Sequence, residues 1–439
     1  MSFNSQVEIS PIDKYNILYH TLFMKKALII TVLITVFYPA GMTLFAQGQD
    51  MSFYTREYNR TDSTPAERLL ILESVRDAGL SGIGDFYHDA LRVFLQRFST
   101  VRFEDRHIAA ASARILAQGL GAEAYNPAAP DLWRLAELYD IARDVNQGLE
   151  MQDALIALGQ VNGTAFITQI VQRLDDLNTQ SIADLGTRER VQRAVVGCVR
   201  ALELLGNPAG FRSVFEVWLK GYENPIRDIA RNALPSIAED PVDIMISMIR
   251  SPSNDPAKKL RIWEEMQNLE LLSDESLARV AAAALDIGWA YSTSSPAEQT
   301  NLRVLRTRAI DIIRILGAAD NSVYANLERS YTRNLTGQFR SIEEINITLH
   351  TLAALGTEEA VQLLVNFLRV IDNNHQARTR LGGSWQDNER LIFQMLINAL
   401  GASRTESVEV MLLLRHIDAG SYTNAERQWA RTAMSNLGF

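Results

Sequence analysis

Apolar residues recur at helical spacing along most of this chain. In one well-defined stretch they follow the i, i+3, i+4, i+7, i+8 pattern of a helix that is buried on one side only. The residues of that stretch are Ile226, Ile229, Ala230, Ala233 and Leu234. No segment of useful length alternates apolar and polar residues, as a half-buried strand would. The pattern therefore predicts an all-α protein.

The predicted helices fall into consecutive pairs. Several helix starts are marked by capping sequences, in which Thr64, Ser295 and Thr423 are each followed three residues later by a glutamate. We expect capping boxes at all three. The predicted pairs cover residues 65–98, 103–145, 149–178, 187–221, 225–250, 256–290, 296–335, 341–371 and 388–417, and a last unpaired helix covers 423–437.

Six of the apolar segments run into a glycine at a nearly constant spacing. The intervals are 40 and 40 residues among the first three glycines, and 39 and 45 among the last three. The six are Gly79, Gly119, Gly159, Gly317, Gly356 and Gly401. A period of roughly 40 to 47 residues is typical of stacked helical hairpins. The chain is therefore expected to form an α-solenoid of about nine hairpins and a terminal helix.

The first 46 residues have the order of a secretory leader. Met24, Lys25 and Lys26 precede an apolar run from Ala27 to Phe37, and a small residue, Ala46, precedes a polar stretch. This order indicates a signal peptide that is cleaved after Ala46. The alternative is an uncleaved membrane anchor, since the apolar region approaches the length that spans a bilayer.

The domain boundaries follow from this interpretation. Residues 1–23 are expected to be a non-native upstream extension, because Met24 suits the role of initiator. The signal peptide covers 24–46, a flexible lead-in 47–63 and the solenoid 64–439. The membrane would then be a partner only through an uncleaved N-terminal segment.

Composition narrows the choice of partner. The formal net charge is −9, which argues against binding a phosphate backbone, because nucleic-acid affinity depends on clustered Lys and Arg. Nearly every cation is an arginine, and arginine can pair with carboxylates through two hydrogen bonds between repeats. The single cysteine, Cys198, lies on an apolar helix face and is expected to be inert packing.

The sequence offers no pattern for catalysis. It contains no His-Glu-x-x-His or Cys/His cluster, no glycine-rich phosphate loop and no Gly-x-Ser-x-Gly motif. Each histidine outside the leader is expected to be a solvated surface residue, and these are His88, His107, His350, His375 and His416. We therefore expect no active site, no metal and no cofactor.

Several segments resemble HEAT repeats. The segments Ala154–Gly159, Leu202–Ala209 and Leu352–Val361 look like the end of a first helix and the turn that follows it, and Asn224–Leu234 is similar to the first helix of the short HEAT-like variant. The resemblance covers about residues 65 to 438. It implies a right-handed superhelix whose second helices line a concave face, used mainly to bind proteins.

The candidate binding residues are polar side chains of the second helices and one aromatic. On the second helices they are Arg92, Arg134, Arg212, Arg329, Arg333 and Arg369, although a merely solvated face also explains them. Trp385 lies in a polar segment, 372–388, and is either an interface anchor or packing between repeats. Trp289 and Tyr291 precede another polar turn, where packing at a helix end is expected.

These features together predict a non-catalytic protein-binding scaffold of the bacterial cell envelope, exported and either periplasmic or associated with the envelope. One alternative is an enzyme on a HEAT-like frame, such as a bilin lyase or an alkyl-base glycosylase. The other is a structural envelope protein that assembles end to end through its unpaired last helix.

Overall fold

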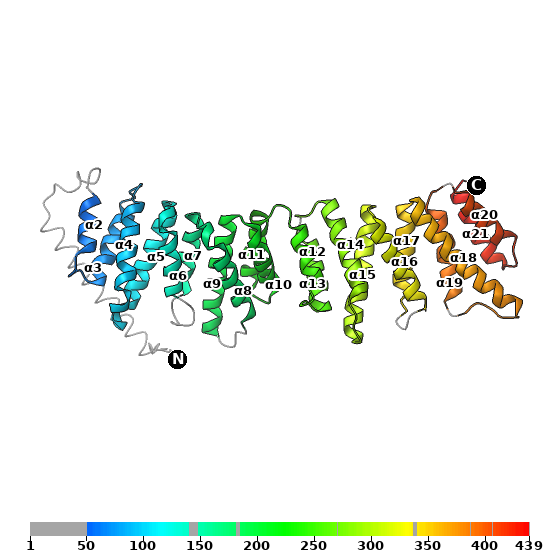
Figure 1. Cartoon of the computed structure of the whole chain (residues 1–439), viewed down its shortest axis with the longest axis horizontal. Coiled ribbons are helices and arrows are strands. Elements are labelled where there is room, and N and C mark those ends of the chain that lie inside the picture. The colour runs from blue at the N-terminus through cyan, green and yellow to red at the C-terminus, as the bar shows by residue number, and fades with distance from the viewer. Residues whose placement is uncertain are drawn as a thin grey trace, which may run out of the picture. The chain divides into compact units, whose positions relative to one another are not determined.

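All regular structure in the described part of the chain is helical. The computed structural model describes residues 51–139, 148–180, 185–269, 271–336, 340–386, 388–405 and 407–438. These ranges hold twenty α-helices and several short 3-10 turns, and no strand (Figure 1). The all-α prediction is confirmed. The upstream extension 1–23 and the signal peptide 24–46 lie outside the described residues.

The described residues divide into two compact units, one that ends at Leu135 and one that begins at Ala136. In the first unit, α2 packs against α3 and α4, and α5 packs against both α3 and α4. The helix α6 crosses the boundary between the units. The bounds of these helices are α2 (Met51–Asn59), α3 (Pro65–Asp77), α4 (Gly84–Arg97), α5 (Arg106–Ala122) and α6 (Ala129–Leu138).

The second unit consists of helical hairpins that follow one another in chain order (Figure 1). The first helices are α7 (Gly148–Gln160), α9 (Leu185–Leu205), α11 (Asn224–Ile237), α13 (Pro256–Gln267), α15 (Pro296–Leu316), α17 (Ile342–Leu355), α19 (Glu389–Ala402) and α21 (Asn424–Asn436). The second helices are α8 (Ile167–Thr179), α10 (Phe211–Leu219), α12 (Val242–Arg250), α14 (Asp274–Ala290), α16 (Asn321–Thr336), α18 (Glu358–Arg380) and α20 (Val408–Ala419).

Helices of this unit pack in two rows. Each second helix from α8 to α18 contacts the next second helix along the chain. The first helices likewise pack α7 on α9, α9 on α11, and then α13 through α21 in succession. At the junction of α11 and α13, side chains make the link: Arg231 donates to the carbonyl of Asn268 over 3.0 Å, and Arg227 pairs with Glu265 over 3.4 Å.

Residues 51–59 form a helix where the sequence analysis placed a flexible lead-in. The reason is one aromatic side chain, Tyr58, which is buried in the first unit with its ring edge against Phe86. Arg68 of α3 also donates to the Tyr58 carbonyl over 3.1 Å. Residues 51–59 are therefore ordered as a helix, and the flexibility of the lead-in stays a prediction.

The polar segment 372–388 is also shorter than expected, because α18 continues to Arg380. Its polar residues Asp372 and His375 are buried rather than solvated. The Tyr422 hydroxyl donates to Asp372, so a residue from the following hairpin satisfies this carboxylate. The loop proper therefore begins at Leu381.

Two of the three predicted capping boxes are present in full. Thr64 and Thr423 each cap a helix that carries the reciprocal glutamate contact. At the third position, Ser295 accepts from the backbone N–H of Glu298, but the Glu298 carboxylate instead accepts a hydrogen bond from the Thr293 hydroxyl. That box is therefore incomplete, because a nearby hydroxyl competes for the glutamate.

The periodic glycines perform two different roles. Gly79, Gly317 and Gly356 follow helix ends with φ of 60°, 66° and 59°, the left-handed region that glycine adopts without strain. The other three lie inside helices where a neighbour comes close. A Cβ on Gly159 would lie 2.9 Å from the Ala201 Cα, and one on Gly401 would lie 2.8 Å from the Ala433 Cα. The close approach of successive first helices depends on such positions.

Two further observations complete the fold. Cys198 is fully buried in α9, and burial raises the pKa of its thiol to about 12, which fits the inert packing expected of it. Among the described residues, no helix combines the length and the apolar character that crossing a bilayer requires.

We predict that Gly401→Ala destabilises the second unit, by about 1–3 kcal/mol, because the new methyl group would push α19 away from α21. The matched control is Gly221→Ala, where an added Cβ meets nothing within 4 Å. Urea unfolding followed by circular dichroism measures both. Equal midpoints for the two variants would contradict this account of the interhelical contact.

Candidate functional site

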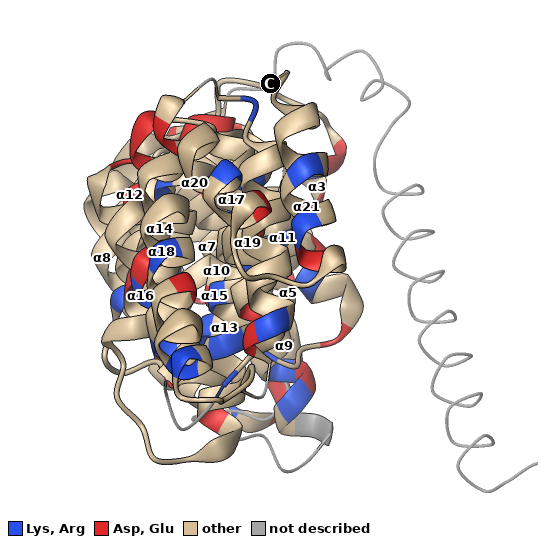
Figure 2. Cartoon of the chain, turned by 90° about the vertical axis from the view of Figure 1, so that its right-hand side faces the viewer, with Lys and Arg blue, Asp and Glu red and all other residues tan. Residues whose placement is uncertain are grey.

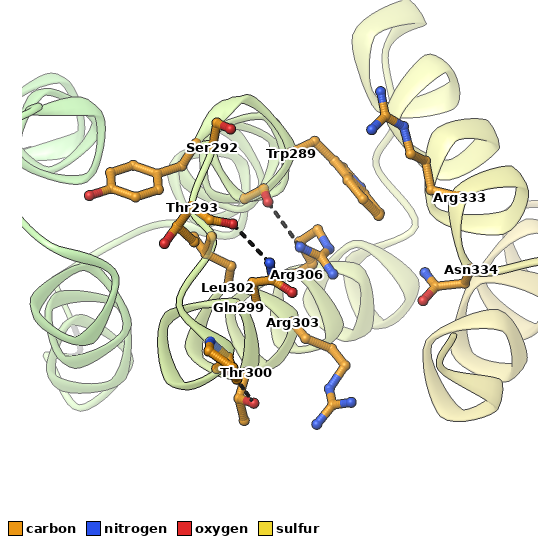
Figure 3. Close-up of a pocket in the computed structure, with 13 residues that line it drawn as sticks. Trp289, Ser292, Thr293, Gln299, Thr300, Leu302, Arg303, Arg306, Arg333 and Asn334 are labelled. Atoms are coloured by element: carbon orange, nitrogen blue, oxygen red, sulfur yellow. Dashed lines mark hydrogen bonds between the residues drawn. The ribbon is translucent and has the colours of Figure 1, made fainter. Parts of the chain in front are cut away.

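A surface cavity of about 610 Å³ opens between α14, α15 and α16 of the second unit (Figure 3). We call it the arginine cavity. Three of its thirteen lining residues are arginines and none is acidic, in a chain whose net charge is −9. The lining residues are Gly288, Trp289, Tyr291, Ser292, Thr293, Pro296, Gln299, Thr300, Leu302, Arg303, Arg306, Arg333 and Asn334.

The floor of the cavity is built around Arg306. Its Nε and Nη2 donate to the two carboxylate oxygens of Glu344 over 2.7 and 2.9 Å, and its Nη1 donates to the Gly288 carbonyl over 2.9 Å. The guanidinium also lies 3.8 Å from the centre of the Trp289 ring. Glu344 has no exposed surface. Arg306 is thus fully engaged within the protein, and its charge is matched by Glu344.

Small and aromatic residues of α14 make room for this arrangement. A Cβ on Gly288 would lie 2.5 Å from the Arg306 Cγ, so only glycine lets the arginine cross α14 here. Trp289 is fixed by a hydrogen bond from its Nε1 to the Ser330 hydroxyl on α16, over 2.8 Å. The floor therefore joins α14, α15, α16 and, through Glu344, α17.

The rim carries the positive charge that is not matched. Arg303 of α15 is half-buried and Arg333 of α16 is exposed, and neither has an ion-pair partner within the described part of the chain. Their guanidinium groups lie on separate sides of the cavity in Figure 3. Asn334 forms part of the cavity wall. Its side chain is held in place because its amide group donates a hydrogen bond to the Ser330 carbonyl and accepts one from the Ser341 N–H.

The other arginines predicted for the second unit do not reach the cavity. Arg329 precedes Arg333 by one turn of α16 and donates to Asn326 over 3.3 Å. Arg369 of α18 pairs with Glu409 of α20 over 2.7 Å, and Arg212 is exposed on α10. Charges of both signs are interspersed along the helices that face the viewer in Figure 2.

The two candidates in the first unit lie around one carboxylate. Arg92 and Arg134 approach Asp131 at 3.4 and 3.5 Å. His88 is buried and its Nε2 lies 3.0 Å from Asp131 Oδ2. The structure thus brings these two arginines together, and Asp131 is a residue that the sequence reasoning missed.

Trp385 packs within its own chain. Its ring is stacked on His375 with centroids 3.6 Å apart and planes 8° apart, and it also contacts Phe393 and Tyr422. Its Nε1 donates to Glu426 Oε1 over 2.9 Å, and Arg390 donates to the same oxygen over 2.9 Å. These contacts favour the packing alternative, although a role in binding partners stays a prediction.

The histidine prediction is right for three residues and wrong for two. His107, His350 and His416 are exposed, as expected. His88 and His375 are only 7% and 8% exposed, because each finds a partner far along the chain. No group of histidine, cysteine or acidic residues in the described ranges is arranged to hold a metal ion.

The environment of His375 lowers the pKa of its imidazole, chiefly through burial. Glu426, Asp372 and Glu389 oppose this shift, and Arg378 adds to it. Burial alone would raise the pKa of Glu426, but hydrogen bonds from Thr423, Arg390 and Trp385 outweigh it and leave that pKa below its usual value. Near neutral pH these shifts favour a neutral His375 and an ionised Glu426.

The sequence contained partial indications of the arginine cavity. Trp289, Tyr291 and the polar turn after them were recognised as unusual, and Arg333 was a candidate. Arg303, Arg306 and Glu344 were not, since a charged residue on a helix is usually assigned to solvent. The Gly288-Trp289 pair was the available signal, because a glycine inside a helix often marks a close approach.

Comparisons with known proteins identify no family. No family model and no curated protein matches the chain. An engineered protein of known structure is 14% identical over 89% of this chain and 99% of its own, with a TM-score of 0.33. Human deoxyhypusine hydroxylase, solved in complex with glycerol, is 14% identical over 91% of this chain and 99% of its own, with a TM-score of 0.23. Similarities this weak carry no argument about function.

We predict that Arg306→Met lowers the stability of the second unit by about 3–5 kcal/mol, because it leaves the Glu344 carboxylate buried without a partner. The double variant Arg306→Met with Glu344→Leu should recover most of the loss, since it removes the buried charge. Thermal and urea unfolding measure both variants. A single variant as stable as the parent, or a double variant no better than the single one, would contradict the role of the pair.

We also predict that stability falls as the pH is lowered from about 6.5 to 5. The pKa of His375 is lower in the folded than in the unfolded chain, so the unfolded chain binds the proton first and acid favours unfolding. His375→Phe keeps an aromatic stack and should flatten the dependence of melting temperature on pH over this range. The control is His350→Gln at an exposed site, and an unchanged slope in His375→Phe would refute the assignment.

Proposed function

We propose that this chain is a HEAT-like, right-handed α-solenoid that acts as a non-catalytic protein-binding scaffold of the bacterial cell envelope. The two rows of helices in the second unit support the solenoid, because each hairpin packs on its neighbours in order. The proposal of export rests on the leader-like order of residues 24–46.

The proposal is supported chiefly by the exposed arginines on the surface of the second helices. Arg212, Arg329 and Arg333 extend from this row into solvent, and within the described ranges Arg212 and Arg333 have no carboxylate partner. Arginine is enriched at protein interfaces, where its planar group can bind carboxylates through two hydrogen bonds. Unmatched arginines on an otherwise acidic protein are suited to a partner with complementary acidic groups.

We predict that Arg212→Glu combined with Arg329→Glu weakens capture of the partner from an envelope fraction by about tenfold at low salt, with a smaller effect at high salt. Helicity and melting temperature should stay near those of the parent, because both side chains are exposed. Quantitative mass spectrometry of the captured proteins gives the measurement.

The matched control is Arg261→Glu with Arg314→Glu, which changes the net charge equally but lies on first helices. It should leave capture unchanged. A partner set that is retained by the second-helix variant, or lost equally by both variants, would count against the proposed surface.

A further inference from the structure

We propose that the arginine cavity recognises an acidic segment of a protein partner, with carboxylate side chains bound at Arg303 and Arg333. This inference rests on the proposed scaffold function and names the chemistry of its partner. It is argued from the charge, the geometry and the size of the cavity.

The first step is the charge that remains available for a ligand. Arg306 is occupied by Glu344 and the Gly288 carbonyl, so it forms the floor and has no excess charge to offer. Arg303 and Arg333 have no such partner among the described residues, and no acidic residue lines the cavity. A ligand at this site therefore meets two unmatched guanidinium groups, each able to bind one carboxylate through two hydrogen bonds.

The second step is the separation of those two groups. Arg303 comes from α15 and Arg333 from α16, and Figure 3 shows them on separate sides of the cavity. The proposed ligand therefore carries two carboxylates along its length, one for the arginine on each side of the cavity.

The third step is the space between them. A volume of about 610 Å³ lies within the range of sites that enclose small ligands, and it accommodates side chains and a short length of backbone. Trp289 and Tyr291 also line the cavity, and both are partly exposed. Their rings provide apolar surface for the methylene groups of glutamate, while Ser292 and Thr300 provide exposed polar groups at the edge.

The test uses a fluorescent octapeptide of alternating glutamate and alanine, and a matched octapeptide with glutamine in place of glutamate. Fluorescence anisotropy at low salt should show binding of the glutamate peptide to the full chain and at least about tenfold weaker binding of the glutamine peptide. The variant Arg303→Ala with Arg333→Ala should lose about tenfold in affinity. Its melting temperature should be unchanged, because neither residue has a described ion-pair partner.

The control variant is Arg261→Ala with Arg314→Ala, which should bind the glutamate peptide like the parent. No binding to the parent chain, or equal loss in both double variants, overturns the proposal. Displacement of the peptide by inorganic phosphate at concentrations near the peptide's own dissociation constant also overturns it, since the site would then be one for a compact anion.

The outcomes separate this inference from the scaffold proposal. If the envelope partner is captured through the second helices but the glutamate peptide does not bind, the scaffold stands and the cavity site fails. If the glutamate peptide binds through Arg303 and Arg333 but no partner depends on the second helices, the cavity site stands and the proposed scaffold surface fails.

Discussion

The buried ion pair between Arg306 and Glu344 is the interaction on which the middle of the second unit depends. Taking two charges out of water costs several kcal/mol for each, and the cost is offset only when every polar atom finds a partner. Here the guanidinium binds both carboxylate oxygens and a carbonyl of α14 and also stacks on Trp289. Only one relative placement of α14, α15 and α17 satisfies all of these contacts.

Related contacts occur at two other junctions between first helices. Arg227 of α11 pairs with Glu265 of α13, and Arg390 of α19 pairs with Glu426 of α21. Each arginine lies 36 to 38 residues before its glutamate, which is about one hairpin. Apolar faces of stacked helices can slide along each other with little change in buried area. Directional pairs fix the register that the apolar contacts leave free.

The sequence predicted the helical pairs well because apolar periodicity and capping residues are local signals. The first residues of α11, α15 and α17 lie within one residue of the expected ones. The glycine spacing was also read correctly as a hairpin period. What it could not reveal is that Gly317 ends a helix while Gly401 allows two helices to approach, because that depends on Ala433 in a later hairpin.

The site was much less predictable, for a physical reason. His88, Asp131, Glu344 and Glu426 can be buried only because each forms a hydrogen bond with a residue 36 to 43 positions away in the sequence. Without those partners each residue would belong on the surface, and the sequence pattern assigns it there. Arg333 could be identified from the sequence because it is exposed, and the exposure of a charged residue can be predicted without knowing any distant partner.

In the site that we propose, stability and recognition depend on different arginines of the same cavity. Arg306 gives its hydrogen bonds to Glu344 and α14, and this fixes the positions of α15 and α16 from which Arg303 and Arg333 extend. A ligand that bound Arg306 directly would have to displace a buried carboxylate and leave it without a partner, which is unfavourable. A ligand is therefore not expected to bind Arg306. The proposed binding groups are Arg303 and Arg333, which have no ion-pair partner in the described part of the chain.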